Sequence, residues 1–321
     1  MTGRTGSPSA IEAIDLTKRY GGTLAVDHLS FSVPPGQVTG FLGPNGSGKS
    51  TTMRMIVGLD RPDEGSVSVG GRPYQRVARP LRMVGALLDA RAVHPGRSAR
   101  DHLLSVALSN GIGRRRVDEL LELVGLAAVA QRRVGGFSLG MCQRLGIAGA
   151  LLGDPPVLLF DEPVNGLDAD GVRWVRTLLR GFAAEGRTVL LASHLMSEMA
   201  LTADRLIVIG RGRLLREAPI DDLLRSPDGT RVRVQSPDAQ VLATVLNRHG
   251  ATVEQVPPNT LRVAGLTIQE VGAIAAGQGL ALTELSEDAV SLEEAYLALT
   301  GDTRDYRAAP TVNDSTPSTH R

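Results

Sequence analysis

Short apolar runs alternate with longer stretches of helical spacing along most of the chain. The runs that read as strands include residues 31–33, 38–42, 157–160 and 189–192. The last two are apolar at every position, which is typical of strands that are buried on both faces of a sheet. Because helical stretches separate these runs, the pattern predicts an α/β fold with a largely parallel sheet.

One internal region departs from this alternation. From Ala99 to Gly125 the spacing is helical only, and we expect a helical subdomain over about residues 90–150 within the α/β core. It carries the arginine triplet 114–116. The triplet can be read as a docking patch for a partner or as a solvated helix face, and the second reading is favoured.

The pattern of apolar and polar residues changes again after Pro219. Strand-like and helix-like segments then follow in the order β-α-β-β-α-β-α, which predicts a small α+β domain of the ferredoxin-like kind. The two ends of the chain are rich in Gly, Ser, Thr, Pro and charge, so we expect flexible tails there. The predicted division is a tail over 1–10, a core domain over 11–225, the small C-terminal domain over 228–301 and a tail over 302–321.

Composition excludes several classes of protein. Among 321 residues, 35 Lys and Arg stand against 34 Asp and Glu, and this net charge of +1 argues against a protein that coats nucleic acid. The single cysteine, Cys142, excludes an internal disulfide. No apolar run approaches the roughly 18 residues of a membrane span, and no signal peptide is visible. We therefore expect a soluble intracellular protein.

The sequence Gly-Pro-Asn-Gly-Ser-Gly-Lys-Ser at residues 43–50 matches the phosphate-loop pattern Gly-x-x-x-x-Gly-Lys-Ser/Thr in full. A predicted strand precedes it and a helical run follows it, as the motif requires. Glycines let successive backbone N–H groups point at phosphate oxygens, and the helix N-terminus adds partial positive charge. Lys49 is expected to bridge the β- and γ-phosphates and Ser50 to ligate Mg²⁺. The predicted nucleotide-binding residues are Gly43, Pro44, Asn45, Gly46, Ser47, Gly48, Lys49, Ser50 and Thr51.

A pair of carboxylates follows the apolar run 157–160. Asp161 is placed to hold Mg²⁺, directly or through water, because a strand end delivers its side chains to the ligand crevice of a parallel sheet. Glu162 is a candidate general base that orients the water attacking the γ-phosphate. The alternative is an ordinary polar strand end.

Three further segments are individually weak signals. Ser138, Leu139 and Gly140 precede a helix that we expect to begin near Met141, so they can form an anion site. Asp168 closely follows the carboxylate pair. His194 follows a strand predicted over 188–192, and this strand-end position favours a contact with the γ-phosphate.

Together these motifs closely resemble the ATP-binding cassette family of transport ATPases, over about residues 11–225. The resemblance implies ATP and Mg²⁺ as ligands and a head-to-tail dimer that sandwiches two ATP molecules. In that dimer Ser138, Leu139 and Gly140 face the partner's nucleotide, and Asp168 lies across the interface. The resemblance also implies that His194 contacts the γ-phosphate and that Tyr20 stacks on adenine.

The sequence departs from the family at two places. The family's Leu-Ser-Gly-Gly-Gln signature reads Phe-Ser-Leu-Gly-Met at 137–141, which keeps Ser138 and Gly140. Asp89 stands where the family places a glutamine. It can still offer an oxygen to Mg²⁺, and we count it as a metal-side residue, but its charge is expected to slow hydrolysis or raise the Mg²⁺ requirement.

The appended domain and its ending over 291–301 resemble the cassette subunits of bacterial drug and antibiotic exporters of the daunorubicin-resistance type. This implies a separate transmembrane permease, docked near residues 89–100, a homodimer as the working pair, and a place on the cytoplasmic face of the membrane. Nucleic acid is not an expected partner. Two alternatives stay open: a non-transport cassette ATPase, and a weakly hydrolytic regulatory subunit, for which Asp89 is the only sequence support.

Overall fold

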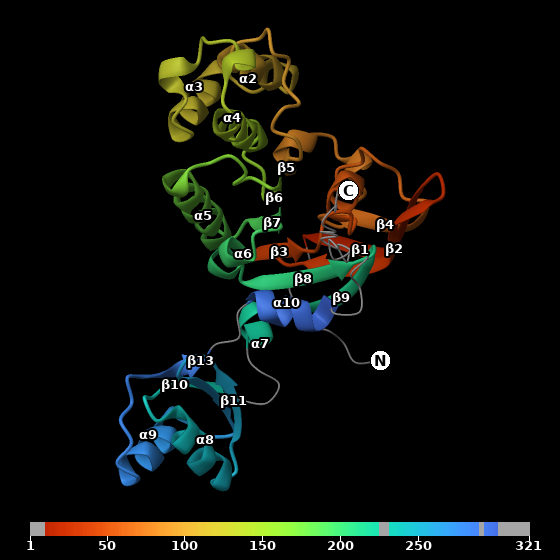
Figure 1. The fold of residues 1–321 in the computed structure, drawn as a ribbon. Coiled ribbons are helices and arrows are strands. Elements are labelled where there is room, and N and C mark those ends of the chain that lie inside the picture. Colours follow the sequence, from red (N-terminus) through yellow and green to blue (C-terminus); the bar gives the residue numbers. More distant parts are fainter. Residues whose placement is uncertain (1–9, 225–230, 289–291, 301–321) are drawn as a thin grey trace, which may run out of the picture.

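The computed structural model describes residues 10–224, 231–288 and 292–300. Apart from Ala10, the two tails predicted at the ends of the chain lie outside these residues. Three bodies follow one another in Figure 1: a helical lobe at the top, the sheets with their helices in the middle, and a small α/β unit at the bottom.

A six-stranded sheet forms the centre of the molecule, in the order β5-β6-β7-β3-β8-β9. The strands from β5 to β8 pair in parallel, and only β9 is antiparallel. The predicted parallel sheet is therefore confirmed. In the order of the sheet the strands are Val84–Leu87, Val157–Asp161, Thr188–Ser193, Val38–Leu42, Arg205–Gly210 and Arg213–Pro219.

A second, antiparallel sheet has the order β2-β1-β4 and lies beside the central one (Figure 1). Its strands are β1 (Ile11–Tyr20), β2 (Thr23–Val33) and β4 (Glu64–Val69). The buried side chains of α1 (Lys49–Ile56) join both sheets in one apolar core, in which the Phe31 and Phe41 rings lie 5.5 Å apart. Only the end of β2 was predicted from the sequence, because β1 mixes polar and apolar residues without strict alternation.

The helical lobe consists of α2 (Ala99–Ser109), α3 (Arg114–Leu123) and α4 (Leu139–Leu151), within the region predicted to be helical. Short 3₁₀ turns lie at Tyr74–Arg76, Pro80–Arg82, Ala127–Val129 and Val134–Gly136. The arginine triplet opens α3. Arg115 is fully exposed and pairs with Glu119 one turn along, while Arg116 donates to the Leu151 carbonyl at 3.0 Å. Arg115 thus fits a solvated helix face, whereas Arg116 is partly buried against the end of α4.

Two helices pack against the central sheet: α5 (Ala169–Ala184) and α6 (Met196–Thr202). The short helix α7 (Ile220–Leu224) follows β9. The C-terminal unit then adds β10 (Arg231–Gln235), α8 (Ala239–Arg248), β11 (Thr252–Val256), β12 (Thr260–Ala264), α9 (Ile268–Gly277) and β13 (Glu284–Asp288). Its sheet has the order β11-β12-β10-β13 with every pair antiparallel, which is the ferredoxin-like arrangement.

The last helix, α10 (Leu292–Thr300), differs from expectation, because the sequence was read as placing it within the C-terminal domain. It returns to the body that holds the central sheet, where it contacts α6, α7 and β9 (Figure 1). Leu292 and Tyr296, one helical turn apart, are buried in the main core of that body. Glu294 pairs with Arg262 of β12 at 3.1 Å, so α10 also contacts the small sheet. The spacing predicted the helix, but not the body on which its apolar stripe packs.

Candidate functional site

The loop between β3 and α1 has a conformation that depends on its glycines. Gly46 and Gly48 have φ values of 81° and 101°, in the left-handed region that glycine adopts without steric penalty. A Cβ at Gly48 would lie 2.5 Å from the Ala25 carbonyl oxygen, and one at Gly43 would lie 2.7 Å from the Ile209 carbonyl oxygen. Any larger residue at these two positions would displace the neighbouring backbone.

The inside of this loop offers donors that fit an anion. Gly48 precedes α1 without a side-chain cap, so no side chain occupies the N–H groups of the first turn. Ser47 is 3% exposed, and its hydroxyl has no hydrogen-bond partner among the described residues. A buried hydroxyl without a partner is unfavourable, and a phosphate oxygen would satisfy it.

The Lys49 ammonium lies over the same loop. It is 7% exposed and donates to the carbonyl oxygens of Gly43 at 2.7 Å and Pro44 at 3.1 Å. Burial lowers the pKa of Lys49, and the nearby carboxylates of Glu162 and Asp161 oppose that shift. The cation and the two strand-end carboxylates therefore share one electrostatic environment, although β3 and β6 are far apart in sequence.

Asp161 lies at the end of β6 beside Ser50. Burial raises its pKa, the Glu162 charge raises it further, and a hydrogen bond with the Ser50 side chain and the Lys49 charge oppose the rise. Two hard oxygen donors thus meet at the mouth of the loop, which suits Mg²⁺. No group of three or more His, Cys, Asp or Glu side chains within the described ranges could hold a metal ion. Other ligands would come from the nucleotide, from water or from Asp89.

Glu162 and His194 contact each other directly. The His194 Nδ1 and the Glu162 Oε1 atoms are 2.8 Å apart, and the Ser193 hydroxyl is 3.5 Å from Oε2. These residues follow β6 and end β7, which pair in parallel, so the sheet brings their ends together. The sequence placed His194 at this edge of the sheet but did not predict its bond to Glu162.

Asp89 lies just beyond β5 and is exposed. Its carboxylate accepts a hydrogen bond from the Arg91 backbone N–H at 2.8 Å, which closes a tight turn. Its assignment as a metal-side residue stays a prediction.

Tyr20 ends β1 with a half-exposed ring. Its hydroxyl donates to Asp60 Oδ2 at 2.6 Å, and Arg54 of α1 donates to the same carboxylate at 2.7 Å. The Lys18 ammonium lies 5.5 Å from the ring centroid. Burial, together with the Asp60 carboxylate, raises the pKa of the Tyr20 phenol. These hydrogen bonds link Tyr20 through Asp60 to α1, the helix that follows the phosphate loop. Much of the Tyr20 ring stays exposed and accessible to a ligand.

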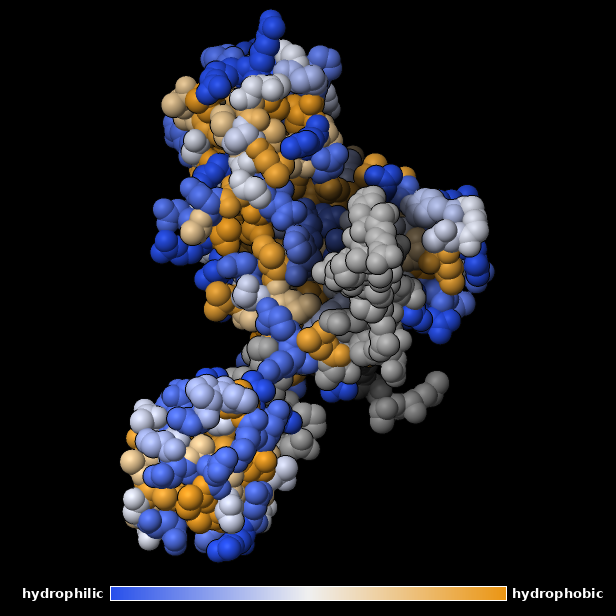
Figure 2. All heavy atoms as spheres, viewed as in Figure 1, coloured by the Kyte–Doolittle hydropathy of each residue, from blue (hydrophilic) through white to orange (hydrophobic). Residues whose placement is uncertain are grey.

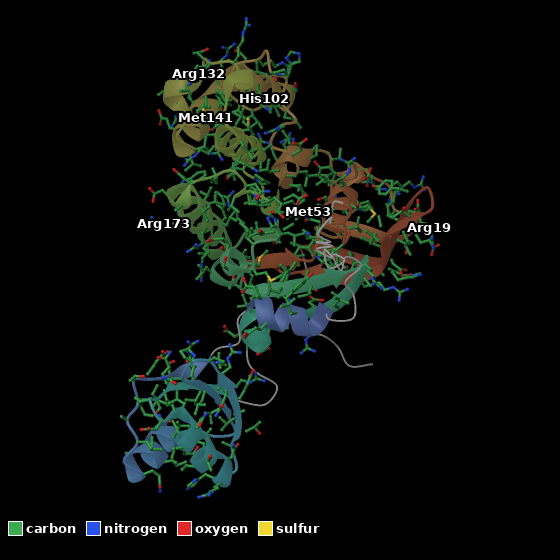
Figure 3. The ribbon with its side chains drawn as sticks, in the orientation of Figure 1. Arg19, Met53, His102, Arg132, Met141 and Arg173 are labelled. Carbon is green, nitrogen blue, oxygen red and sulfur yellow. The ribbon has the colours of Figure 1, made fainter. Side chains whose placement is uncertain are left out.

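The signature segment, residues 137–141, lies on the helical lobe and not beside the phosphate loop. Ser138 is exposed and caps α4 by accepting from the Met141 N–H at 3.2 Å, so the helix begins at Leu139 and not near Met141 as expected. The physical reason is that the Ser138 hydroxyl satisfies the first turn. In Figure 3, Met141 lies on the helical lobe, well apart from Met53 of the phosphate-loop helix.

Asp168 lies close to the signature segment. Gly140 packs so tightly on the loop before Asp168 that a Cβ there would lie 2.7 Å from the Gly166 carbonyl oxygen. Asp168 is exposed and caps α5, accepting from the Gly171 N–H at 2.8 Å. Among the described residues, no hydrogen bond or ion pair joins Ser138 or Asp168 to the phosphate loop.

Sequence reasoning missed Gln143 and Asp60. Gln143 is 5% exposed on α4, and its side chain donates to the Glu162 carbonyl oxygen at 3.0 Å. A glutamine in an otherwise apolar helix face was the available signal. Asp60, which binds the Tyr20 hydroxyl, lies in an irregular segment and gave no signal.

Comparisons with known proteins bear on the whole arrangement. The profile of the ABC transporter family matches residues 26–165, and that of a domain of unknown function matches residues 230–293. The bacitracin transport ATP-binding protein of Bacillus licheniformis is 42% identical over 216 residues, which is 66% of this chain and 71% of that protein. The Nod factor export ATP-binding protein I of Burkholderia orbicola is 36% identical over 301 residues, 92% of this chain and 98% of that protein.

Two solved structures are similar to the core. The ATP-binding subunit of an ABC transporter has a TM-score of 0.62 at 26% identity, covering 67% of this chain and 92% of that one. A dimeric ATP-binding cassette in a post-hydrolysis state with ADP and Pi has a TM-score of 0.60 at 25% identity, covering 65% and 98%. Within the described residues, no helix is long and apolar enough to cross a membrane.

Proposed function

The chain belongs to the ATP-binding cassette transporter family and is the ATPase subunit of such a system, and we propose that it powers export of an antibiotic or a similar amphipathic compound through a separate permease. The observation that carries the ATPase chemistry is the convergence of Lys49, Asp161 and Glu162 at one edge of the sheet. Export of this kind of compound is supported by relatives named for bacitracin, lantibiotic and Nod factor transport.

In the proposed cycle, the residues 43–51 cradle the phosphates of ATP, and Lys49 exchanges its two carbonyl partners for β- and γ-phosphate oxygens. Ser50 and Asp161 would hold Mg²⁺, with Asp89 on the metal side. When bound, the metal ion neutralises charge on the phosphates. Glu162 orients the attacking water. His194, which contacts Glu162 in this structure, then contacts the γ-phosphate. Catalysis of ATP hydrolysis then depends on positioning and electrostatic stabilisation, with no covalent intermediate.

The second half of each site is proposed to come from another copy of this chain. Ser138, Leu139 and Gly140 would face the partner's nucleotide, with Asp168 at the same interface. Support comes from the exposure of Ser138 and Asp168, from their place on a surface away from the phosphate loop, and from the dimeric state of a similar cassette. Two equal sites in a homodimer follow.

The permease is proposed to dock on the helical lobe. Residues 89–100 border a groove of about 260 Å³ that is lined by Arg91, Val93, Pro95, Val134, Gly135, Phe137, Leu139 and Cys142. Figure 2 shows apolar side chains at the surface of this lobe. A groove with a mixed polar and apolar lining and one arginine suits an amphipathic helix carrying an acidic residue. The chain would then lie on the cytoplasmic face of the membrane.

Reconstitution tests the export function. The chain and its permease, placed together in proteoliposomes, are expected to show faster ATP hydrolysis than the chain alone and to move a labelled amphipathic antibiotic in an ATP-dependent way. Hydrolysis without movement of any amphipathic compound would count against export. Very slow hydrolysis with the permease present would favour the regulatory alternative, whose support is Asp89.

Replacing Tyr20 by Ala tests the adenine contact. Loss of base stacking, worth about 1–3 kcal/mol, should weaken MgATP binding roughly 5- to 150-fold. Binding of inorganic triphosphate should not change, because it has no base. Isothermal titration with both ligands measures the difference, and Tyr20→Phe, which keeps the ring, is the matched control. Equal losses for both ligands would show that Tyr20 acts through the fold of the loop.

A further inference from the structure

The backbone of Glu162 is held in an unfavourable conformation. Its φ is 51°, in the left-handed region that residues with a Cβ rarely adopt, and such a conformation persists only when its surroundings fix it. Three hydrogen bonds do so. The Glu162 N–H donates to the Ala192 carbonyl at 2.9 Å, and the Glu162 carbonyl accepts from the Asn165 N–H at 3.3 Å and from Gln143 Nε2 at 3.0 Å. Only the last bond comes from a side chain.

Stability alone does not explain a glutamine at this place. Gln143 is 5% exposed, and its Oε1 atom has no hydrogen-bond partner among the described residues. A buried acceptor without a partner destabilises the folded state, so an apolar residue of the same length would suit the site better. The reverse orientation of the amide would set Oε1 against the Glu162 carbonyl oxygen and is excluded by repulsion. The bond to Glu162 is what the glutamine supplies.

Gln143 also connects two parts of the molecule that serve different nucleotides in the proposed dimer. It lies on α4, the helix that the exposed Ser138 of the signature segment caps. The same helix contacts the loop after Glu162 a second time, through the close approach of Gly140 to Gly166. A movement of α4 would therefore reach the Glu162 backbone through two contacts.

We propose that Gln143 is a positioning residue for Glu162, and that its side chain ties the glutamate of one nucleotide site to the helix that contacts the nucleotide of the other. The inference rests on the proposed function, in which Glu162 orients the attacking water. Gln143 itself touches neither water nor nucleotide. It fixes the backbone from which the carboxylate projects.

Gln143→Met tests this role, because methionine keeps the length of the side chain and cannot donate to the Glu162 carbonyl. Steady-state hydrolysis should show kcat reduced between about 10- and 100-fold, as expected for a misplaced catalytic group, with the KM for MgATP within about twofold of wild type. The melting temperature should stay equal or rise, since the unpaired Oε1 is removed. Arg144→Met is the matched control: Arg144 lies on the same helix and donates to the Val124 carbonyl at 3.1 Å, so its loss should leave kcat unchanged.

A wild-type kcat in Gln143→Met would overturn the inference. So would a lower kcat that comes with an equally lowered melting temperature, because that is the result of a purely structural role. If Gln143→Met does not fold, Gln143→Glu serves instead, since an ionised carboxylate of the same length cannot donate either. Glu162→Gln distinguishes a failure of the proposed function from a failure of the role inferred for Gln143. Normal hydrolysis in Glu162→Gln overturns the proposed function, whereas an inactive Glu162→Gln beside a fully active Gln143→Met overturns only the role of Gln143.

Discussion

Glu162→Gln is expected to lower ATP turnover by about 10²- to 10⁴-fold, the size of effect that loss of a general base produces. Glutamine keeps the length of the side chain and can still bond to His194 Nδ1, which lies 2.8 Å from the carboxylate. It cannot accept a proton from the attacking water. The phosphate loop is untouched, so MgATP affinity should stay within about twofold of wild type. Steady-state hydrolysis and equilibrium titration of the same preparation measure both quantities.

Glu198→Gln is the matched control for this substitution. Glu198 lies nearby on α6, and its carboxylate is paired with Arg176 at 2.7 Å and is part-buried. The same change of charge there should leave turnover near wild type. If Glu162→Gln hydrolysed ATP at a normal rate, Glu162 would lose its assigned part and another group would have to orient the water. If both variants lost turnover equally, the cause would be the general change of charge.

The sequence predicted the parts of the site that depend on local order. The apolar run before Asp161 required a buried strand, and parallel pairing then fixed the edge to which Asp161 and Glu162 are delivered. The glycines at 43, 46 and 48 predicted a loop that larger residues cannot form. The structure shows close backbone contacts at Gly43 and Gly48, and a left-handed φ of 81° at Gly46. The helix after Ser138 was predicted, but its start was placed near Met141, whereas Ser138 caps it and it begins at Leu139.

The remaining features depend on contacts between distant segments, which a single sequence does not encode visibly. The Tyr20 hydroxyl meets Asp60 across 40 positions, and the Arg54 guanidinium that holds Asp60 gave no motif. The register that places Gln143 under the Glu162 carbonyl follows from how α4 packs on the central sheet. The apolar stripe of α10 fits either body equally well by pattern, and only the available surface on α6, α7 and β9 decides between them.

Lys49→Ala is expected to weaken MgATP binding by about 10²- to 10⁴-fold, because each hydrogen bond to a charged group is worth about 1.5–3 kcal/mol and two are lost. The structure adds a second effect. Burial raises the pKa of the partly buried Asp161 and the Glu162 charge raises it further, whereas the Lys49 charge lowers it. Without the lysine, the pKa of Asp161 rises further, so its carboxylate becomes protonated at a higher pH and then binds Mg²⁺ less well. The loss of affinity should therefore grow as the pH falls, and titration at several pH values measures it.

Lys18→Ala is the control that the chain itself offers, because Lys18 is its only other lysine. Its ammonium donates to the Arg61 carbonyl at 2.7 Å and pairs with Asp63 at 3.1 Å, outside the phosphate loop. Removal of that charge changes the field around Tyr20 and should weaken MgATP binding much less than Lys49→Ala does. Equal affinity in Lys49→Ala and wild type would refute the phosphate-loop assignment, since the one buried cation among the three converging charges would then have no part in holding the nucleotide.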